Sequence, residues 1–217
     1  LLIKIQKIKR KEVKTFLKTK YKIPFYSNKI ILNEANLFTD WYVPKIIKKQ
    51  KVNTLKVQLN KIYIKLLSNM KLKNNIFVHR DFHVSNLMKV KKNIGVIDAQ
   101  DALYGNMAYD LASLIDDVRI KTTNKLKEKI FLEFIRSNKK VDKNKLKNDF
   151  EILSVLRNLK IIGIFTRLSI RDKKHNYLKL IPHAWKLIEY RINKNHKFKE
   201  LRSVLDKYFP KKIRQLK

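Results

Sequence analysis

The sequence contains no cysteine and only three glycines, Gly95, Gly105 and Gly163, each isolated from the others. Without cysteine the chain forms no disulfide and no thiolate metal site, which agrees with a reducing compartment. Because no two glycines lie close together, neither G-x-G-x-x-G nor a P-loop can be written anywhere in the chain. The common glycine-rich phosphate-binding loops are therefore excluded.

Long apolar runs are also missing. No run approaches the roughly 18 to 20 residues that a membrane helix needs. The first ten residues, LLIKIQKIKR, lack the order of a signal peptide, in which charge precedes an apolar block. We therefore expect a cytoplasmic protein. The chain does not begin with methionine, which predicts that the natural reading frame starts further upstream.

Acidic residues are few: 18 Asp and Glu stand against 52 Lys and Arg, for a net charge of +34. Such an excess suggests a nucleic-acid or anionic-membrane partner. Lysine, however, far outnumbers arginine and is spread over almost every segment, whereas base readout favours clustered arginine and aromatic platforms. We therefore expect no dedicated nucleic-acid or membrane partner, and a positive field that attracts small anions.

The length of 217 residues suits one domain with a substantial core. Residues 1–20 fit a helix, with a strand as the alternative, and Tyr21–Ser27 reads as a loop. Ser27 begins a helix that we expect to stop before Pro44. Apolar residues at helical spacing predict further helices over 53–70, 125–135, 146–168, 182–192 and 198–208. The predicted class is α+β, mainly helical.

One short stretch carries the chemistry. The β-prone run Ile76–Val78 leads into His79, Arg80 and Asp81, and Asn86 follows five residues after the aspartate. This H-x-D-x4-N spacing is typical of a phosphotransferase catalytic loop. In such a loop a carboxylate orients the acceptor hydroxyl and takes its proton, so Asp81 is the predicted catalytic residue.

A hairpin follows the loop. Residues 87–90 and 94–97 read as two strands around the three-residue loop 91–93, which would pair Val90 with Ile94 and bring Asn86 opposite Asp98. Directly paired residues lie about 4.5–5.5 Å apart. Mg²⁺ prefers hard oxygen ligands and uses few protein groups beside phosphates and water. Asn86 and Asp98 are therefore the predicted ligands of Mg²⁺ and, through it, of ATP.

The run from Val78 to Arg119 resembles the aminoglycoside phosphotransferase-like branch of the protein-kinase-like superfamily. Within it, GVIDAQDALYGNMAYDLASLIDD is similar to the bacterial anomeric N-acetylmuramate/N-acetylglucosamine kinases of cell-wall recycling, as is the stretch from Arg157 to Trp185. The resemblance implies a single kinase-like C-lobe over 1–217, with the catalytic loop and metal hairpin at 76–101 and a helical acceptor-site region at 107–210. It also implies ATP- and Mg²⁺-dependent phosphorylation of an amino-sugar hydroxyl.

Other polar residues of the motif are predicted to support the loop. His79 and His83 can act as base or metal ligand, but backbone anchoring is the favoured role, and Arg80 is grouped with them. Asp110 can cap a helix, whereas the resemblance implies that it holds the catalytic-loop backbone. Asp101 can contact substrate or cap a turn.

The C-terminal helices supply candidate acceptor contacts. Arg167, Arg171 and His175 can bind an anionic sugar, although solvated charges are the commoner reading of such residues. Three aromatic residues can stack on a sugar, with core packing as the favoured alternative; they are Phe38, Trp41 and Tyr42.

The residues before the catalytic loop read as helices, and no β-rich segment with a V-A-I-K-like lysine precedes it. A kinase of this kind carries a further lobe of roughly 100 residues, which we expect upstream, so the isolated chain is expected to be inactive. Two alternatives remain open. One is a kinase of another small alcohol, of choline or aminoglycoside type, and the other is a catalytically silent binding module.

Overall fold

The computed structural model describes residues 1–193 and 195–215. The chain divides into two compact units, each built from two separate stretches. The first unit comprises Leu1–Ser27 and Lys71–Phe150, and the second comprises Asn28–Met70 and Glu151–Lys217. The long helix α7, Lys143–Arg171, supplies residues to both. The single-lobe boundaries expected from the sequence stay a prediction.

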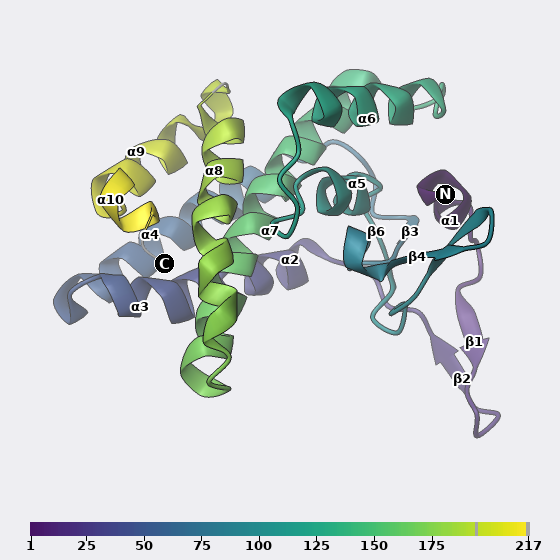
Figure 1. Ribbon diagram of the computed structural model, residues 1–217, viewed down its shortest axis with the longest axis horizontal. Coiled ribbons are helices and arrows are strands. Elements are labelled where there is room, and N and C mark those ends of the chain that lie inside the picture. Colours follow the sequence, from purple (N-terminus) through teal and green to yellow (C-terminus); the bar gives the residue numbers. More distant parts are fainter. Residues whose placement is uncertain (194, 216–217) are drawn as a thin grey trace. The chain divides into compact units, whose positions relative to one another are not determined.

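The first unit holds all the named strands together with α1, α5 and α6 (Figure 1). Three antiparallel pairs form, β1 with β2, β3 with β6 and β4 with β5. Its elements are α1 (Leu2–Gln6), β1 (Glu12–Lys14), β2 (Lys20–Lys22), β3 (Ile76–Val78), the 3-10 turn η2 (Val84–Asn86), β4 (Leu87–Val90), β5 (Asn93–Val96), β6 (Leu103–Gly105), α5 (Ala108–Ile115), α6 (Asn124–Arg136) and the start of α7.

A small apolar core fixes β3 and β6, the strands that lead into the catalytic loop and away from the hairpin. Phe77 pairs with Tyr104 across the two strands, and both side chains pack with Ile23. Tyr26 lies so close to Gly105 that a Cβ added to this glycine would come within 3.0 Å of the Cβ of Tyr26. The strand Ile76–Val78 predicted from the sequence is confirmed; its partner β6 was not predicted.

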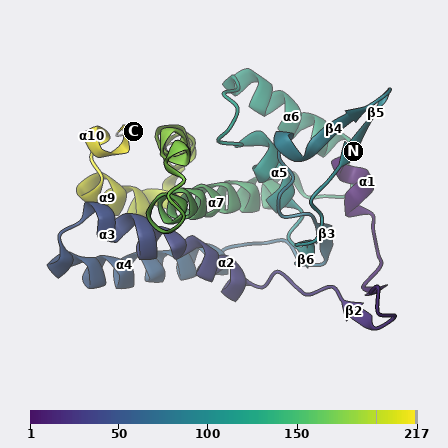
Figure 2. The same cartoon turned by 60° about the horizontal axis from the view of Figure 1, so that its bottom comes forward.

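The second unit is helical. Figure 2 shows α4 passing beside α2 and α3, which it contacts. Its elements are α2 (Asn28–Ala35), the π turn η1 (Phe38–Tyr42), α3 (Val43–Ile46), α4 (Lys49–Ser68), the larger part of α7, the 3-10 turn η3 (His175–Leu180), α8 (Ile181–Ile192), the 3-10 turn η4 (His196–Phe198), α9 (Lys199–Tyr208) and α10 (Lys211–Arg214).

An aromatic cluster forms much of the core of this unit. The rings of Phe38, Tyr42, Trp185 and Phe209 lie within 6.0 Å of one another, centroid to centroid, in every contacting pair. All four side chains are buried, and burial raises the pKa of the Tyr42 hydroxyl. Phe38 and Tyr42 are thus core residues of this unit, which agrees with the favoured sequence interpretation, and Arg214 stacks over Trp185.

The helix boundary expected before Pro44 is wrong. Helix α2 already ends at Ala35, the chain makes the π turn Phe38–Tyr42, and Pro44 lies in the first turn of α3. Proline is tolerated there because the N–H groups of a first helical turn have no acceptor within the helix. The N–H of Val43 instead closes the π turn on the carbonyl oxygen of Phe38.

The N-terminal expectation holds only in part. Helix α1 ends at Gln6, and the chain then forms the β1–β2 hairpin instead of continuing as a helix to residue 20. The strand over Lys20–Lys22 also overlaps the start of the predicted loop Tyr21–Ser27. Alternating exposed lysines and threonines in this stretch suit a solvated two-stranded ribbon, in which only Val13 turns inward.

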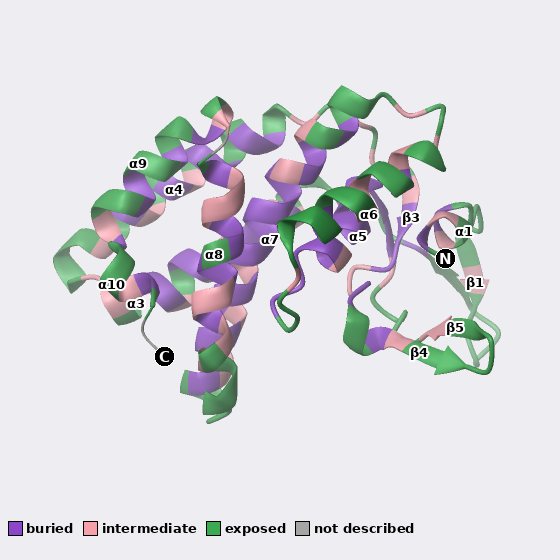
Figure 3. Cartoon of the chain, turned by 45° about the horizontal axis from the view of Figure 1, so that its top comes forward, coloured by how far each residue is buried: buried purple, intermediate pink, exposed green. Residues whose placement is uncertain are grey.

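The long periodic helices are confirmed, as is the mainly helical α+β class. Figure 3 shows that the buried residues of α5 and α7 form nearly continuous stretches, whereas α6 is exposed along much of its length. Thr123 caps α6 by accepting a hydrogen bond from the Leu126 N–H. None of the helices in the described ranges combines the length and the apolar composition needed to cross a membrane.

Helix α7 passes unusually close to the π turn of the second unit. A Cβ built on Gly163 would lie 2.3 Å from the carbonyl carbon of Leu37 and 2.5 Å from the nitrogen of Phe38. Real Cβ atoms essentially never approach backbone atoms so closely. Only glycine fits at this crossing.

Candidate functional site

The catalytic loop leaves β3 and is held from beneath by α5. The backbone N–H groups of His79 and Arg80 donate to the two carboxylate oxygens of Asp110 at 2.7 and 3.0 Å. Asp110 is fully buried in the first turn of α5. Its carboxylate makes the loop contacts that the resemblance implies, and the N-cap position of α5 is Met107, which forms no side-chain cap hydrogen bond.

The backbone turns sharply before the catalytic aspartate. Arg80 adopts a positive φ of 72°, which is uncommon for a residue with a side chain and persists only where surrounding contacts fix it. Here the Asp110 carboxylate fixes the N–H of Arg80, and the Arg80 guanidinium lies over the ring of Tyr26, 5.5 Å from its centroid. Asp81 therefore follows a rigidly held turn.

Asp81 presents a carboxylate that no other described residue binds. Its carbonyl oxygen accepts hydrogen bonds from the His83 N–H at 2.9 Å and from Asn86 Nδ2 at 3.0 Å. No hydrogen bond or ion pair engages its side chain within residues 1–193 and 195–215. The side chain is half-buried. A carboxylate with a fixed backbone and free oxygens is suited to accept a proton from a bound hydroxyl.

The hairpin has a register different from the predicted one. Val90 pairs with Asn93, not Ile94, so the turn contains the two residues Lys91 and Lys92. Lys91 takes a positive φ of 52°, a conformation that glycine or asparagine usually adopts. A lysine at this position therefore does not predict a two-residue turn. The predicted three-residue loop is therefore wrong, and Asn86 lies opposite Ile97, whose N–H donates to the Asn86 carbonyl at 3.1 Å.

Asn86 and Asp98 nevertheless meet at the open end of the hairpin. Asp98 has a positive φ of 69°, and Asn86 Nδ2 lies 3.4 Å from Asp98 Oδ2. The other carboxylate oxygen of Asp98 accepts a hydrogen bond from Gln100 Nε2. The changed register shifts the pairing by one residue, and the turn of the chain at Asp98 brings its carboxylate back toward Asn86.

The donor set at this position fits Mg²⁺. Asn86 and Asp98 offer amide and carboxylate oxygens, the hard ligands that Mg²⁺ prefers. In the described part of the chain, no group of three or more His, Asp or Glu side chains forms a metal cage. A pair of ligands is the number expected for Mg²⁺ that is otherwise held by substrate phosphates and water.

Two supporting residues tie the loop to the hairpin. His79 is buried, and its Nε2 lies 3.0 Å from the Ile97 carbonyl oxygen, directly before Asp98. Arg80 Nη1 lies 3.5 Å from the carbonyl oxygen of Asp101 and 4.0 Å from its carboxylate. His83 is buried as well. These contacts connect the segment that carries Asp81 to the segment that carries Asp98.

A comparison with known proteins shows which family this part of the chain is similar to. Residues 32–135 match the model of the phosphotransferase enzyme family. The matched segment includes Asp81, Asn86, Asp98 and Asp110, so the resemblance drawn from the motif is confirmed.

Curated relatives named N-acetylmuramate/N-acetylglucosamine kinase are also similar to the chain. The protein of Neisseria meningitidis is 32% identical over 83% of this chain and 53% of its own length. The protein of Pseudomonas aeruginosa is 27% identical over 84% of this chain and 56% of its own length. The protein of Caulobacter vibrioides is 30% identical over 64% of this chain and 40% of its own length. The chain thus spans about half the length of the curated relatives it matches.

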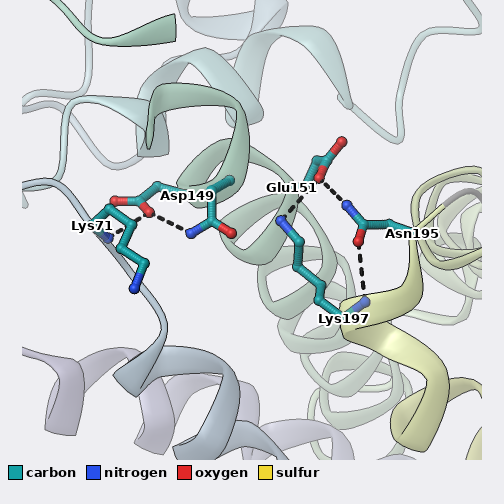
Figure 4. Close-up of polar contacts among 6 residues, drawn as sticks. Lys71, Asp149, Glu151, Asn195 and Lys197 are labelled. Atoms are coloured by element: carbon teal, nitrogen blue, oxygen red, sulfur yellow. Dashed lines mark hydrogen bonds and ion pairs between the residues drawn. The ribbon is translucent and has the colours of Figure 1, made fainter. Parts of the chain in front are cut away.

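Two buried aspartates that accept backbone N–H groups before and after β3 were not predicted from the sequence. Asp117 accepts from the Val84 N–H at 3.3 Å and from the Arg119 N–H at 3.0 Å. Asp149 accepts from the N–H of Lys71 at 2.8 Å (Figure 4) and from the N–H of Leu72 at 2.8 Å. The signal for Asp149 was present, since it is an acidic residue at an apolar position of α7.

Asp149 also reaches α5. Asn106 donates to it at 2.7 Å, and the amide oxygen of Asn106 accepts from the N–H of Ala108, the first residue of α5. Asp149 is fully buried and accepts hydrogen bonds at both oxygens. A continuous set of hydrogen bonds therefore runs from α7 through Asn106 to the helix that carries Asp110.

We expect Asp149→Asn to lower the free energy of unfolding by about 2 kcal/mol, because one acceptor oxygen becomes an NH₂ group facing N–H donors. Glu128→Gln, which removes one exposed carboxylate on α6, is the matched control and should change stability by less than about 0.5 kcal/mol. Urea denaturation followed by circular dichroism measures both. Equal midpoints for the two variants would show that the Asp149 contacts contribute nothing net.

The candidate acceptor residues lie in the second unit. Arg171 is exposed and forms an ion pair with Asp172 at 2.6 Å, and the hydrogen bond from Arg171 lowers the pKa of the Asp172 carboxyl. His175 Nδ1 lies 2.8 Å from Ser169 Oγ, and Arg167 is half-buried. The catalytic loop belongs to the first unit, so a role of these residues in acceptor binding stays a prediction.

Proposed function

We propose that the protein containing this chain transfers the γ-phosphoryl group of ATP to the anomeric hydroxyl of N-acetylmuramate or N-acetylglucosamine, in the cytoplasm. The observation that carries the proposal is the Asp81 carboxylate, which has no hydrogen-bond partner among the described residues. It lies on a loop fixed by Asp110, next to Asn86 and Asp98, whose side chains are within hydrogen-bond distance of each other. The names of the curated relatives supply the substrate class. Because the chain spans about half of those relatives, the activity is assigned to the complete reading frame.

In the proposed reaction, Asp81 accepts a hydrogen bond from the acceptor hydroxyl and takes its proton. The hydroxyl oxygen forms a bond to the γ-phosphorus, and the bond from this phosphorus to the bridging oxygen of the leaving ADP breaks. Asn86 and Asp98 would hold Mg²⁺, which when bound offsets charge on the β- and γ-phosphates. Asp110 keeps Asp81 in position through the backbone of His79 and Arg80.

The 217 residues contain neither a glycine-rich loop nor a strand lysine of the V-A-I-K type to cradle the phosphates. We therefore propose that the isolated chain turns over ATP slowly, if at all, and that a further lobe supplies this cradle. Activity should be measured on the complete reading frame and compared with that of the chain by itself.

The deciding experiment measures ADP release and sugar phosphate formation across a panel of acceptors. We expect transfer to N-acetylmuramate and N-acetylglucosamine that requires Mg²⁺. The methyl glycoside of N-acetylglucosamine is the matched control, because its anomeric hydroxyl is blocked while the other hydroxyls remain. Transfer to this glycoside, or transfer only to choline or kanamycin, would contradict the proposal.

The net charge of +34 predicts a salt effect that separates the two amino sugars. N-acetylmuramate carries a carboxylate and N-acetylglucosamine does not, so the positive field should increase kcat/KM only for the former. We expect kcat/KM for N-acetylmuramate to fall more steeply as sodium chloride is added. Parallel salt curves for the two sugars would show that the field makes no difference to acceptor binding.

A further inference from the structure

The β1–β2 hairpin is a well-defined ribbon with a three-residue tip. Glu12, Val13 and Lys14 pair with Lys22, Tyr21 and Lys20, in that order. The N–H of Thr15 donates to the Thr19 carbonyl at 2.8 Å, and the two threonine hydroxyls lie 2.6 Å apart. Lys18 takes a positive φ of 58°, as the last residue of a three-residue hairpin loop does. The tip consists of Phe16, Leu17 and Lys18.

The base of this hairpin is anchored and its tip is not. Val13 packs against the core cluster of Ile23, Phe77 and Tyr104. Phe16 is 100% exposed and Leu17 is 79% exposed, whereas no other large apolar side chain of the described residues exceeds the 57% of Val57. Figures 1 and 2 show the hairpin extending away from β3 and β6 of the same unit. Two bulky apolar side chains are thus presented to solvent together.

Positive charge surrounds the apolar tip. Residues 7–22 contain eight lysine and arginine residues and a single acidic residue, Glu12. Lys14 and Lys20 lie directly opposite each other in the ribbon. Like charges at paired positions destabilise a hairpin, and an anionic surface close to both removes that penalty. The charge of the hairpin therefore complements a negative surface.

We propose that the β1–β2 hairpin binds an anionic lipid bilayer. Phe16 and Leu17 enter the boundary between the headgroups and the acyl chains, while the lysines of both strands contact the headgroups. The even spread of lysine along the sequence predicts no membrane partner, and the structure revises this because it places lysines around an exposed apolar tip. Seven lysines with one arginine, and a leucine that offers no stacking face, favour lipid over nucleic acid.

Vesicle flotation of the 217-residue chain tests the proposal. We expect the chain to float with vesicles of phosphatidylcholine mixed with phosphatidylglycerol, and to remain in the lower fraction with phosphatidylcholine alone. Added salt should weaken the binding, because the lysine contacts are screened. Equal binding to both kinds of vesicle, or binding to neither, would overturn the proposal.

Substitution of the apolar tip residues distinguishes binding by the hairpin from binding by the net positive charge of the chain. The double variant Phe16→Ser, Leu17→Ser should lower the partition coefficient at least about tenfold, since both side chains leave the boundary region. The control variant Val57→Ser, Ile64→Ser removes two exposed apolar side chains from α4 and should bind as the wild type does. Indistinguishable binding of the two variants would overturn the assignment.

The charge is tested in the same way. Lys14→Gln, Lys18→Gln and Lys20→Gln together should weaken binding several-fold and flatten its salt dependence. Lys139→Gln, Lys140→Gln and Lys147→Gln remove the same charge from other exposed positions and should have little effect. Phe16→Trp should show bilayer-dependent quenching by brominated lipid that exceeds that of the wild type. Loss of binding in the second lysine set, or no added quenching, would show that the hairpin is not the contact.

Discussion

Asp81→Asn in the complete reading frame should lower kcat at least about 100-fold, the loss typical for a removed general base. The amide keeps the shape of the side chain and can still contact a hydroxyl, but it cannot take the proton. Because Asp98 and Asn86 are the proposed metal ligands, the Kd for Mg-ATP should stay within about threefold of the wild type. Single-turnover kinetics and nucleotide titration measure the two quantities separately.

The control for this variant is Asp40→Asn, which removes the same charge. Asp40 forms an exposed ion pair with Lys56, and such pairs contribute at most about 1 kcal/mol to stability. Its kcat should be unchanged. Near-normal turnover of the Asp81→Asn protein would show that Asp81 is not the general base.

Gly163→Ala should lower the free energy of unfolding by about 3 kcal/mol, because a methyl group forced into a well-packed crossing moves both partners. The direction is informative, since Gly→Ala in an open helix interior stabilises a protein by up to about 1 kcal/mol. Here the new Cβ would lie 2.4 Å from the Leu37 carbonyl oxygen. The melting temperature should fall by roughly 6 to 12 °C for a chain of this size.

Gly95→Ala in β5 provides the internal comparison. Its nearest new contact would be Val90 Cγ2 at 3.4 Å, which is an ordinary van der Waals distance or slightly tighter, so only a small change is expected. Urea denaturation should show a lower midpoint for Gly163→Ala with an unchanged m-value. A more stable Gly163→Ala protein would mean that α7 and the π turn lie further apart than the structure has them.

The local features of the site followed from the sequence, while those that depend on distant contacts did not. Spacing was enough to place Asp81 and Asn86 on one loop after a strand, because only four residues lie between them. The hairpin register was missed because it depends on the positive φ of Lys91, and lysine carries no preference for that conformation. The pairing of β3 with β6 joins segments that are distant in the sequence, and local sequence patterns do not predict such pairings.

Buried acidic residues are a second feature that the sequence predicts poorly. Asp110 and Asp149 have the same residue type, and both are fully buried, yet only the first lay inside a recognisable motif. Asp149 occupies an inward position of α7, so helical periodicity could have identified it as an unusual buried charge. Periodicity does not give the partners of such a charge, which here come from residues 71, 72 and 106.

The interleaved chain order of the two units affects synthesis on the ribosome. The stretch Asn28–Met70 belongs with Glu151–Lys217, so Phe38 and Tyr42 emerge well before Trp185 and Phe209, their ring partners. At 5 to 20 residues per second, the interval between Met70 and the last residue is roughly 7 to 30 s. During this time α4 lacks its contact with α9, and Phe38 and Tyr42 lack two of their ring partners. Nascent chains stalled between residues 70 and 180 should therefore be the forms that chaperones capture most readily.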